Sequence, residues 1–189
     1  MPENPIRLEA NSRFERLDFA KESLISLFDH LHFSRSDHGL AGELSLAFLS
    51  DSELASIHAD FLGDSTPTDV ITFPGEASDG LVGEICVSVE RAEMEALARN
   101  ELFERELTLY LVHGWLHLVG FDDMEDADRL LMREAERNLW ALSKKQALFP
   151  IFVSPRSRLT NSHSVHFCFL RCSRNFATPS LRAFLFSCL

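Results

Sequence analysis

The sequence HGWLHLVGFDD, residues 113–123, decides how the rest of this chain is interpreted. Two histidines four residues apart on a helix project from one face, so His113 and His117 can bind one metal ion. Gly120 can adopt the backbone conformations that end a helix, and Asp123 beyond that turn is a third candidate ligand. Structural zinc sites normally use four protein ligands, most of them cysteines. This pattern has three ligands without cysteine, so it predicts a catalytic site with an open coordination position. The first hypothesis is hydrolysis by a metal-activated water.

The combination is more specific than the histidine pair alone. With 8 histidines in 189 residues, about 0.3 HxxxH pairs are expected by chance, and about 0.003 once the following glycine and the Asp, Glu or His are required. The alternative is a helix whose histidines hydrogen-bond locally, with Asp122 and Asp123 merely solvated. The run therefore favours a metal site.

Size and composition favour one domain with a real core. Of the four cysteines, Cys86 lies alone in a strand-like run, where a small buried thiol is expected, and the others fall after residue 149. The first residues contain no apolar signal segment, and no apolar run approaches the length needed to span a membrane. A disulfide scaffold is therefore not expected, and the predicted location is the cytoplasm.

The hydrophobic pattern predicts an α+β fold, a small mixed β-sheet flanked by helices with a central metal-binding helix. That helix carries several large apolar side chains, as expected for a buried position: Tyr110, Leu111, Trp115 and Leu118. Helices are expected over 15–32, from Asp51 or Ser52 to about residue 60, 90–99, from a cap at Asn100 to about 118, and 124–146. Strands are expected over 43–49, 68–74 and 81–89, the last two as a hairpin.

Charge and composition divide the chain at about residue 149. The last 40 residues contain five arginines, six phenylalanines and no acidic residue, so residues 1–149 hold all 29 acidic residues against 13 basic ones. An acidic body repels nucleic acid in bulk, so an RNA substrate requires a local basic patch, a metal or a partner. We expect a metal-dependent domain over 1–149. For residues 150–189 the expectation is a disordered or adventitious tail, with an RNA-contacting or partner-binding arm as the alternative.

Three blocks together resemble one known family. The run from His113 to Asp123 resembles the HGxLHLxGYDH signature of the YbeY family of bacterial endoribonucleases, the rRNA maturation factors. Residues 67–74, PTDVITFP, are similar to that family's PTDVLSFP, and residues 83–88, GEICVS, to its GDIxIS strand. The blocks occur in the family's order, and the resemblance covers about residues 5–148.

The resemblance implies one zinc ion per chain on His113, His117 and Asp123, and a single-strand-specific endoribonuclease that acts in rRNA processing. The implied partners are ribosomal RNA precursor and the small ribosomal subunit, with no membrane and no DNA partner.

Two residues depart from the family pattern. Asp123 stands where the third ligand is usually histidine, and it remains a competent zinc ligand although it adds negative charge. Leu62 stands where many members have an arginine, so either another cation such as Arg91, Arg99 or Arg105 reaches the phosphate, or this chain binds RNA differently.

A carboxylate must also manage protons during hydrolysis, and Asp69 is the candidate general base. Its structural alternative is to cap the turn at Pro67 and Thr68. Asp122 is expected beside the metal ligands, accepting a hydrogen bond from a ligand imidazole or a backbone N–H. RNA could instead supply its own 2′-hydroxyl as the nucleophile, and both routes stay open.

Two other functions compete with the nuclease. The zincin-like HxxxHxxGxxD spacing resembles the metal-binding half of metzincin proteases, but those need a glutamate after the first histidine, and this chain has Gly114. The second alternative is a non-catalytic, RNA-binding ribosome-assembly factor with a structural metal site. The acidic body and Leu62 favour that alternative.

Overall fold

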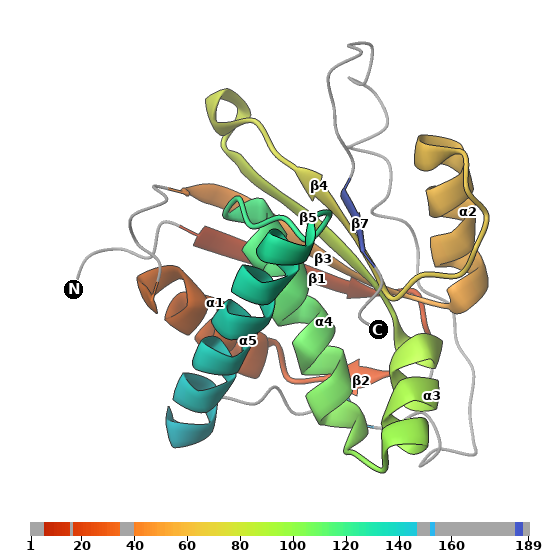
Figure 1. The fold of residues 1–189 in the computed structure, drawn as a ribbon. Coiled ribbons are helices and arrows are strands. Elements are labelled where there is room, and N and C mark those ends of the chain that lie inside the picture. Colours follow the sequence, from red (N-terminus) through yellow and green to blue (C-terminus); the bar gives the residue numbers. More distant parts are fainter. Residues whose placement is uncertain (1–5, 16, 35–39, 147–151, 154–183, 187–189) are drawn as a thin grey trace.

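The computed structural model describes residues 6–15, 17–34, 40–146, 152–153 and 184–186. These residues form a mixed sheet with helices on both faces (Figure 1). The predicted α+β class is confirmed. The elements in chain order are β1 (Ile6–Ser12), β2 (Asp18–Phe19), α1 (Lys21–Ser34), β3 (Gly42–Leu49), α2 (Asp51–Leu62), β4 (Val70–Pro74), the 3-10 turn η2 (Ala77–Asp79), β5 (Leu81–Ser88), α3 (Val89–Arg99), α4 (Phe103–Leu118), α5 (Asp126–Gln146), β6 (Phe152–Val153) and β7 (Phe184–Phe186).

The main sheet has the strand order β1-β3-β5-β4-β7. β1 pairs with β3 and β3 with β5 in parallel, whereas β4 pairs antiparallel with both β5 and β7. The antiparallel β4–β5 pair, joined across η2, confirms the predicted hairpin. The β1 strand was not expected from the sequence, although its alternating burial is typical of a strand with one face on a core. β2 and β6 form a separate two-stranded pair.

The two faces of the sheet are covered by different helices. On one face, α1, α3, α4 and α5 pack over alternate residues of β1, β3 and β5 and form the larger hydrophobic core. On the other face, Leu54 and Ile57 of α2 pack with Leu49, Ile71 and Cys86 in a smaller cluster. α4 lies in front of the sheet in Figure 1, between α5 and α3. Trp115 and Tyr110 of α4 are almost fully buried, and burying a side chain of this size stabilises the fold by roughly 2–3 kcal/mol.

Several predicted helix boundaries differ from the structure, among them the start of α5, which is Asp126 and not residue 124. The helix expected over 15–32 begins only at Lys21, because the segment before it forms β2 and pairs with β6. Asn100 does not begin α4: it ends α3 in a left-handed conformation, and its N–H bonds to carbonyls of α3, so the N-cap of α4 is Leu102. The cap of α2 is Ser50, in a capping box with Glu53.

Several expectations fall on residues that the structure does not describe. Apart from β6 and β7, the predicted tail over 150–189 lies outside the described residues, and so does the side chain of Leu62. The division into a 1–149 domain and a tail therefore stays a prediction. Among the described residues, no helix is both long enough and apolar enough to cross a membrane.

Gly114 lets α4 lie directly on the sheet. A Cβ atom added there would lie 2.6 Å from Ile85 Cγ2 and 3.1 Å from Thr72 Cγ2. The first distance is shorter than real Cβ contacts, and both neighbours are buried branched side chains. Any side chain at 114 would therefore push the helix away from β4 and β5, and with it the histidines at 113 and 117.

We predict that Gly114→Ala destabilises the protein although alanine is the better helix former. Overpacking of this kind costs about 1–3 kcal/mol, and the helix propensity of alanine returns about 1 kcal/mol, so the expected net loss is up to about 2 kcal/mol. Chemical denaturation measures the free energy of unfolding. In the double variant Gly114→Ala/Ile85→Ala the loss should be smaller than the sum of the single losses, and strict additivity would contradict a direct clash.

Candidate metal centre

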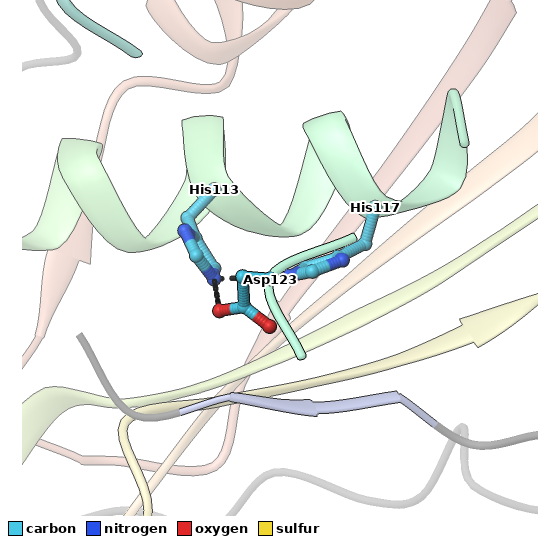
Figure 2. A group of neighbouring side chains, drawn as sticks. All are labelled: His113, His117 and Asp123. Carbon is cyan, nitrogen blue, oxygen red and sulfur yellow. Dashed lines mark hydrogen bonds and ion pairs between the residues drawn. The ribbon is translucent and has the colours of Figure 1, made fainter. Parts of the chain in front are cut away.

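The two histidines of the motif converge from one face of α4. His113 and His117 are 3% and 4% exposed, and their Nε2 atoms lie 3.0 Å apart (Figure 2). Their rings meet edge to face with centroids 4.6 Å apart. The i, i+4 spacing of a helix therefore places both ring nitrogens at one point, as predicted from the sequence.

Asp123 reaches the same point from the loop after α4. Gly120 has φ 94°, a backbone conformation that favours glycine, and the chain turns back there with Phe121 N–H donating to the carbonyl of Leu116. Asp123 Oδ2 lies 3.8 Å from His113 Nε2, as Figure 2 shows. Candidate ligand atoms of His113, His117 and Asp123 all lie within 4.8 Å of one another, so this group could hold a metal ion.

The other nitrogen of each imidazole is held by a hydrogen-bond acceptor. His113 Nδ1 lies 2.6 Å from Glu136 Oε1, and His117 Nδ1 lies 2.9 Å from the carbonyl oxygen of Phe121. Because both partners accept, each Nδ1 must donate, and in the neutral rings each Nε2 presents a lone pair to the shared point. Two lone pairs facing each other at 3.0 Å repel unless a proton or a cation lies between them.

The donor set fits a zinc ion. Two imidazole nitrogens and one carboxylate oxygen are ligands that Zn²⁺ accepts, and three protein ligands leave a position for water or substrate. Asp123 Oδ1 is buried and has no hydrogen-bond partner, which is costly for a carboxylate oxygen unless a ligand meets it.

Burial shifts the pKa values of two of the three candidate ligands. Burial lowers the pKa of His117 to about 3, so its imidazole is neutral at physiological pH. Burial also raises the pKa of Asp123 to about 6. Both pKa shifts have the same cause: burial removes water from the side chains, which disfavours the charged form of each. A bound divalent cation would reverse it for the carboxylate.

Sequence reasoning missed Glu136. It lies on α5, 23 positions after His113, and the spacing of the motif contains no information about it. The available signal was an acid on an apolar helix face, since Met132, Ala135 and Leu139 are buried and Glu136 lies beside them. A buried-face acid needs a partner, and here the partner is the imidazole of His113.

Asp122 and Asp69, which the sequence also singled out, do not belong to the group of three residues whose ligand atoms converge. Asp122 Oδ1 accepts hydrogen bonds from the backbone N–H groups of Asp123 and Met124, so its contacts organise the loop. Asp69 is 4% exposed, and its Oδ1 accepts from the N–H of Val70 at 3.0 Å. It also acts electrostatically on Glu106, which lies about two helical turns, roughly 10 Å, before His113 on α4.

The three arginines considered as substitutes for the family arginine are already bound to carboxylates. Arg91 pairs with Asp51 at 3.0 Å, and Arg99 pairs with both Glu95 and Glu106. Arg105 pairs with Glu101 and also lies over the ring of Trp140. A phosphate at any of them would have to compete with these acids.

The chain is similar in sequence and in fold to known proteins. A sequence model of the family described as "Endoribonuclease YbeY" matches residues 9–143. A protein named Endoribonuclease YbeY from Protochlamydia amoebophila is 39% identical over 111 residues, which cover 57% of this chain and 74% of that protein. Its namesake from Flavobacterium johnsoniae is 42% identical over 95 residues, covering 50% and 68%. The solution structure of TM1509 from Thermotoga maritima matches with a TM-score of 0.50 at 26% identity, covering 76% of this chain and 94% of that one.

The hydrogen bond from His113 to Glu136 predicts the effect of a single substitution. Glu136→Gln removes the charged acceptor that orients the imidazole, and such outer partners typically change metal affinity by about 10–100-fold. We expect weaker zinc binding in competition with a chromophoric chelator. The control is Glu134→Gln, a neighbouring exposed acid on the same helix. Equal affinities of the two variants would contradict an orienting role for Glu136.

The shifted pKa values predict how metal affinity depends on pH. Asp123 must lose its proton to bind, and with a pKa of about 6 it is protonated in metal-free protein below that pH. His117 is neutral well below pH 6, so it adds no pH dependence in this range. Zinc affinity, measured by titration from pH 5 to 8, should therefore fall as the pH drops through 6. An affinity that stays constant down to pH 5 would contradict ligation by Asp123.

Proposed function

As the chain belongs to the YbeY family of endoribonucleases, we propose that it is a zinc-dependent endoribonuclease, a hydrolase that cuts phosphodiester bonds within single-stranded RNA. The observation that carries the proposal is that candidate ligand atoms of His113, His117 and Asp123 lie within 4.8 Å of one another. Two neutral nitrogens and one carboxylate suit a catalytic rather than a structural site, because a fourth position stays open. We propose one zinc ion per chain.

Zinc bound at such a site lowers the pKa of a water ligand and polarises a phosphoryl oxygen. The side chains of this protein supply the conditions for that chemistry. Glu136 and the carbonyl of Phe121 hold the two imidazoles in the tautomers that present Nε2. Burial of both rings keeps bulk water away from them, which strengthens electrostatic interactions with a charged substrate.

Proton transfer needs a further group, and Asp69 is the general base that we propose from the sequence. Its hydrogen bond from the Val70 N–H supports the alternative role, which is to hold the start of β4. The two roles predict different consequences for Asp69→Asn. Loss of a base lowers the RNA cleavage rate and alters its pH profile, whereas loss of a turn contact lowers stability and leaves the pH profile unchanged.

For the cellular role, we propose maturation of ribosomal RNA precursors at the small ribosomal subunit in the cytoplasm. Membership of the family supports this substrate class. DNA and membranes are not proposed as partners. The finer assignment rests on family membership, since residues 1–149 are acidic and the arginines Arg91 and Arg99 are paired with carboxylates.

That charge pattern supports a second candidate, a non-catalytic RNA-binding assembly factor with a structural metal. Arg91, Arg99 and Arg105 each pair with a carboxylate, so a phosphate backbone would have to compete with these acids for their charge. A metalloprotease is not supported. The position that would carry its glutamate is Gly114, and the space beside it is filled by Ile85 and Thr72.

Cleavage of RNA by the full-length chain separates the two candidates. We expect a single-stranded rRNA precursor fragment to be cut in a metal-dependent way, and His117→Ala to reduce the rate at least about 100-fold, since loss of a ligand abolishes the site. Labelled RNA and gel electrophoresis measure the rate, with Glu134→Gln as the matched control. Cleavage that persists in His117→Ala would come from a contaminant and would reject the catalytic proposal. Binding of small-subunit particles without cleavage, unchanged by His117→Ala, would establish the assembly factor instead.

A further inference from the structure

One side chain ties the loop that carries Asp123 to the start of α5. Arg129 Nη1 donates to the carbonyl oxygen of Asp123 at 2.9 Å and to that of Met124 at 2.8 Å. Its Nη2 pairs with Asp126, the first residue of α5. A guanidinium that bridges two consecutive carbonyls and a carboxylate fixes their relative positions, because its donors form a rigid planar fork.

The other side of the same loop is held by Asp122. Its Oδ1 accepts from the backbone N–H of Asp123 at 2.7 Å and of Met124 at 3.1 Å. Both peptide groups that flank Asp123 are therefore restrained, one N–H by Asp122 and one carbonyl by Arg129. Only the side-chain torsions of Asp123 stay adjustable, and these aim the carboxylate at the two histidines.

A ligand aspartate makes two demands that a histidine would not. Its side chain is shorter than that of histidine, so the loop backbone must lie closer to the metal. Its charge also makes the site more negative by one unit than a neutral imidazole would. The Arg129 guanidinium meets both demands, since it holds the loop at the carbonyl of Asp123 and adds a positive charge that acts on that carboxylate.

We propose that Arg129 is a positioning residue for the metal ligand Asp123, fixing its loop and balancing its charge. The proposal rests on the proposed function, because it assumes that the three converging residues bind a metal. The Arg129 side chain is 44% exposed, so water screens its charge and the hydrogen bonds to the carbonyls carry most of the effect. We therefore expect an effect near the lower end of the range for outer partners of a metal site, about tenfold in affinity.

The test is zinc affinity of full-length, metal-free protein, measured against a chromophoric chelator. Arg129→Gln should weaken zinc binding about tenfold, and Arg129→Lys, which keeps the charge but not the fork, should fall between that variant and the original protein. The control is Arg137→Gln, which removes the same charge from an exposed position two turns further along α5. His117→Ala measures binding elsewhere on the chain, and thermal unfolding of the metal-free variants shows that each is folded.

A second background shows whether Arg129 acts through Asp123. Asp123→His replaces the short charged ligand by a neutral longer one, so Arg129→Gln should change zinc affinity by less than about twofold in that background. Cobalt absorption spectra supply a readout that stability does not move. Arg129→Gln should lower the visible extinction of the cobalt form, since a loosened carboxylate lets water expand the coordination shell.

Unchanged zinc affinity in Arg129→Gln would overturn the proposal, and so would an equal loss in the Asp123→His background, because Arg129 would then act independently of the aspartate. If Arg129→Gln does not fold, the Arg129→Lys variant and the Asp123→His background decide between the same outcomes. A protein that binds zinc with the expected Arg129 dependence and leaves RNA intact would reject the proposed function alone. A protein that binds no zinc through His117 would reject both.

Discussion

The close contact between α4 and the sheet at Gly114 is the constraint on which the site depends. Because no side chain separates the helix from Ile85 and Thr72, the backbone of α4 approaches β4 and β5 directly. This contact fixes the orientation of the residues on either side of Gly114. His113 faces the other candidate ligands, and Trp115 is buried in the core. A helix held this closely cannot rotate to present its histidines to solvent without losing the packing of its whole apolar face.

Polarity inside the core is tolerated here because nearly every polar group of the site has a directed partner. Glu136 and the Phe121 carbonyl accept from the two imidazoles, and Asp122 accepts from the loop. The two Nε2 atoms and the Asp123 carboxylate converge on the shared point, and Asp123 Oδ1 is buried without a hydrogen-bond partner. The surrounding hydrogen bonds therefore direct the acceptor atoms of His113, His117 and Asp123 to one position. That is the electrostatic requirement for holding a cation.

Much of the fold and the centre of the site could be predicted from the sequence. Helical periodicity located α4, and the i, i+4 spacing with a glycine turn placed His113, His117 and Asp123 together. The β1 strand was missed because it has no turn signal of its own, and its pairing with β3 joins segments far apart in the chain. Glu136 and Arg129 were missed for a related reason: how α5 is rotated against α4 depends on packing, which local spacing does not encode. Asn100 was assigned to the wrong helix because the same residue type favours both a helix start and a left-handed helix end.

The residues of the candidate metal centre all lie in one continuous stretch, from His113 to Glu136, while the strands β1 to β5 that support them come earlier in the chain. A ribosome synthesises the chain from its N-terminus, so the sheet strands β1, β3, β4 and β5 are available before the site residues emerge, and of the described strands of that sheet only β7 follows them. The parallel pairing of β1 with β3 requires long-range closure and is the slow part of such a fold, whereas joining α4, its loop and α5 is local. Metal uptake would therefore follow assembly of the sheet, and a chain halted before α5 would carry both histidines and Asp123 but lack the acceptor that orients His113.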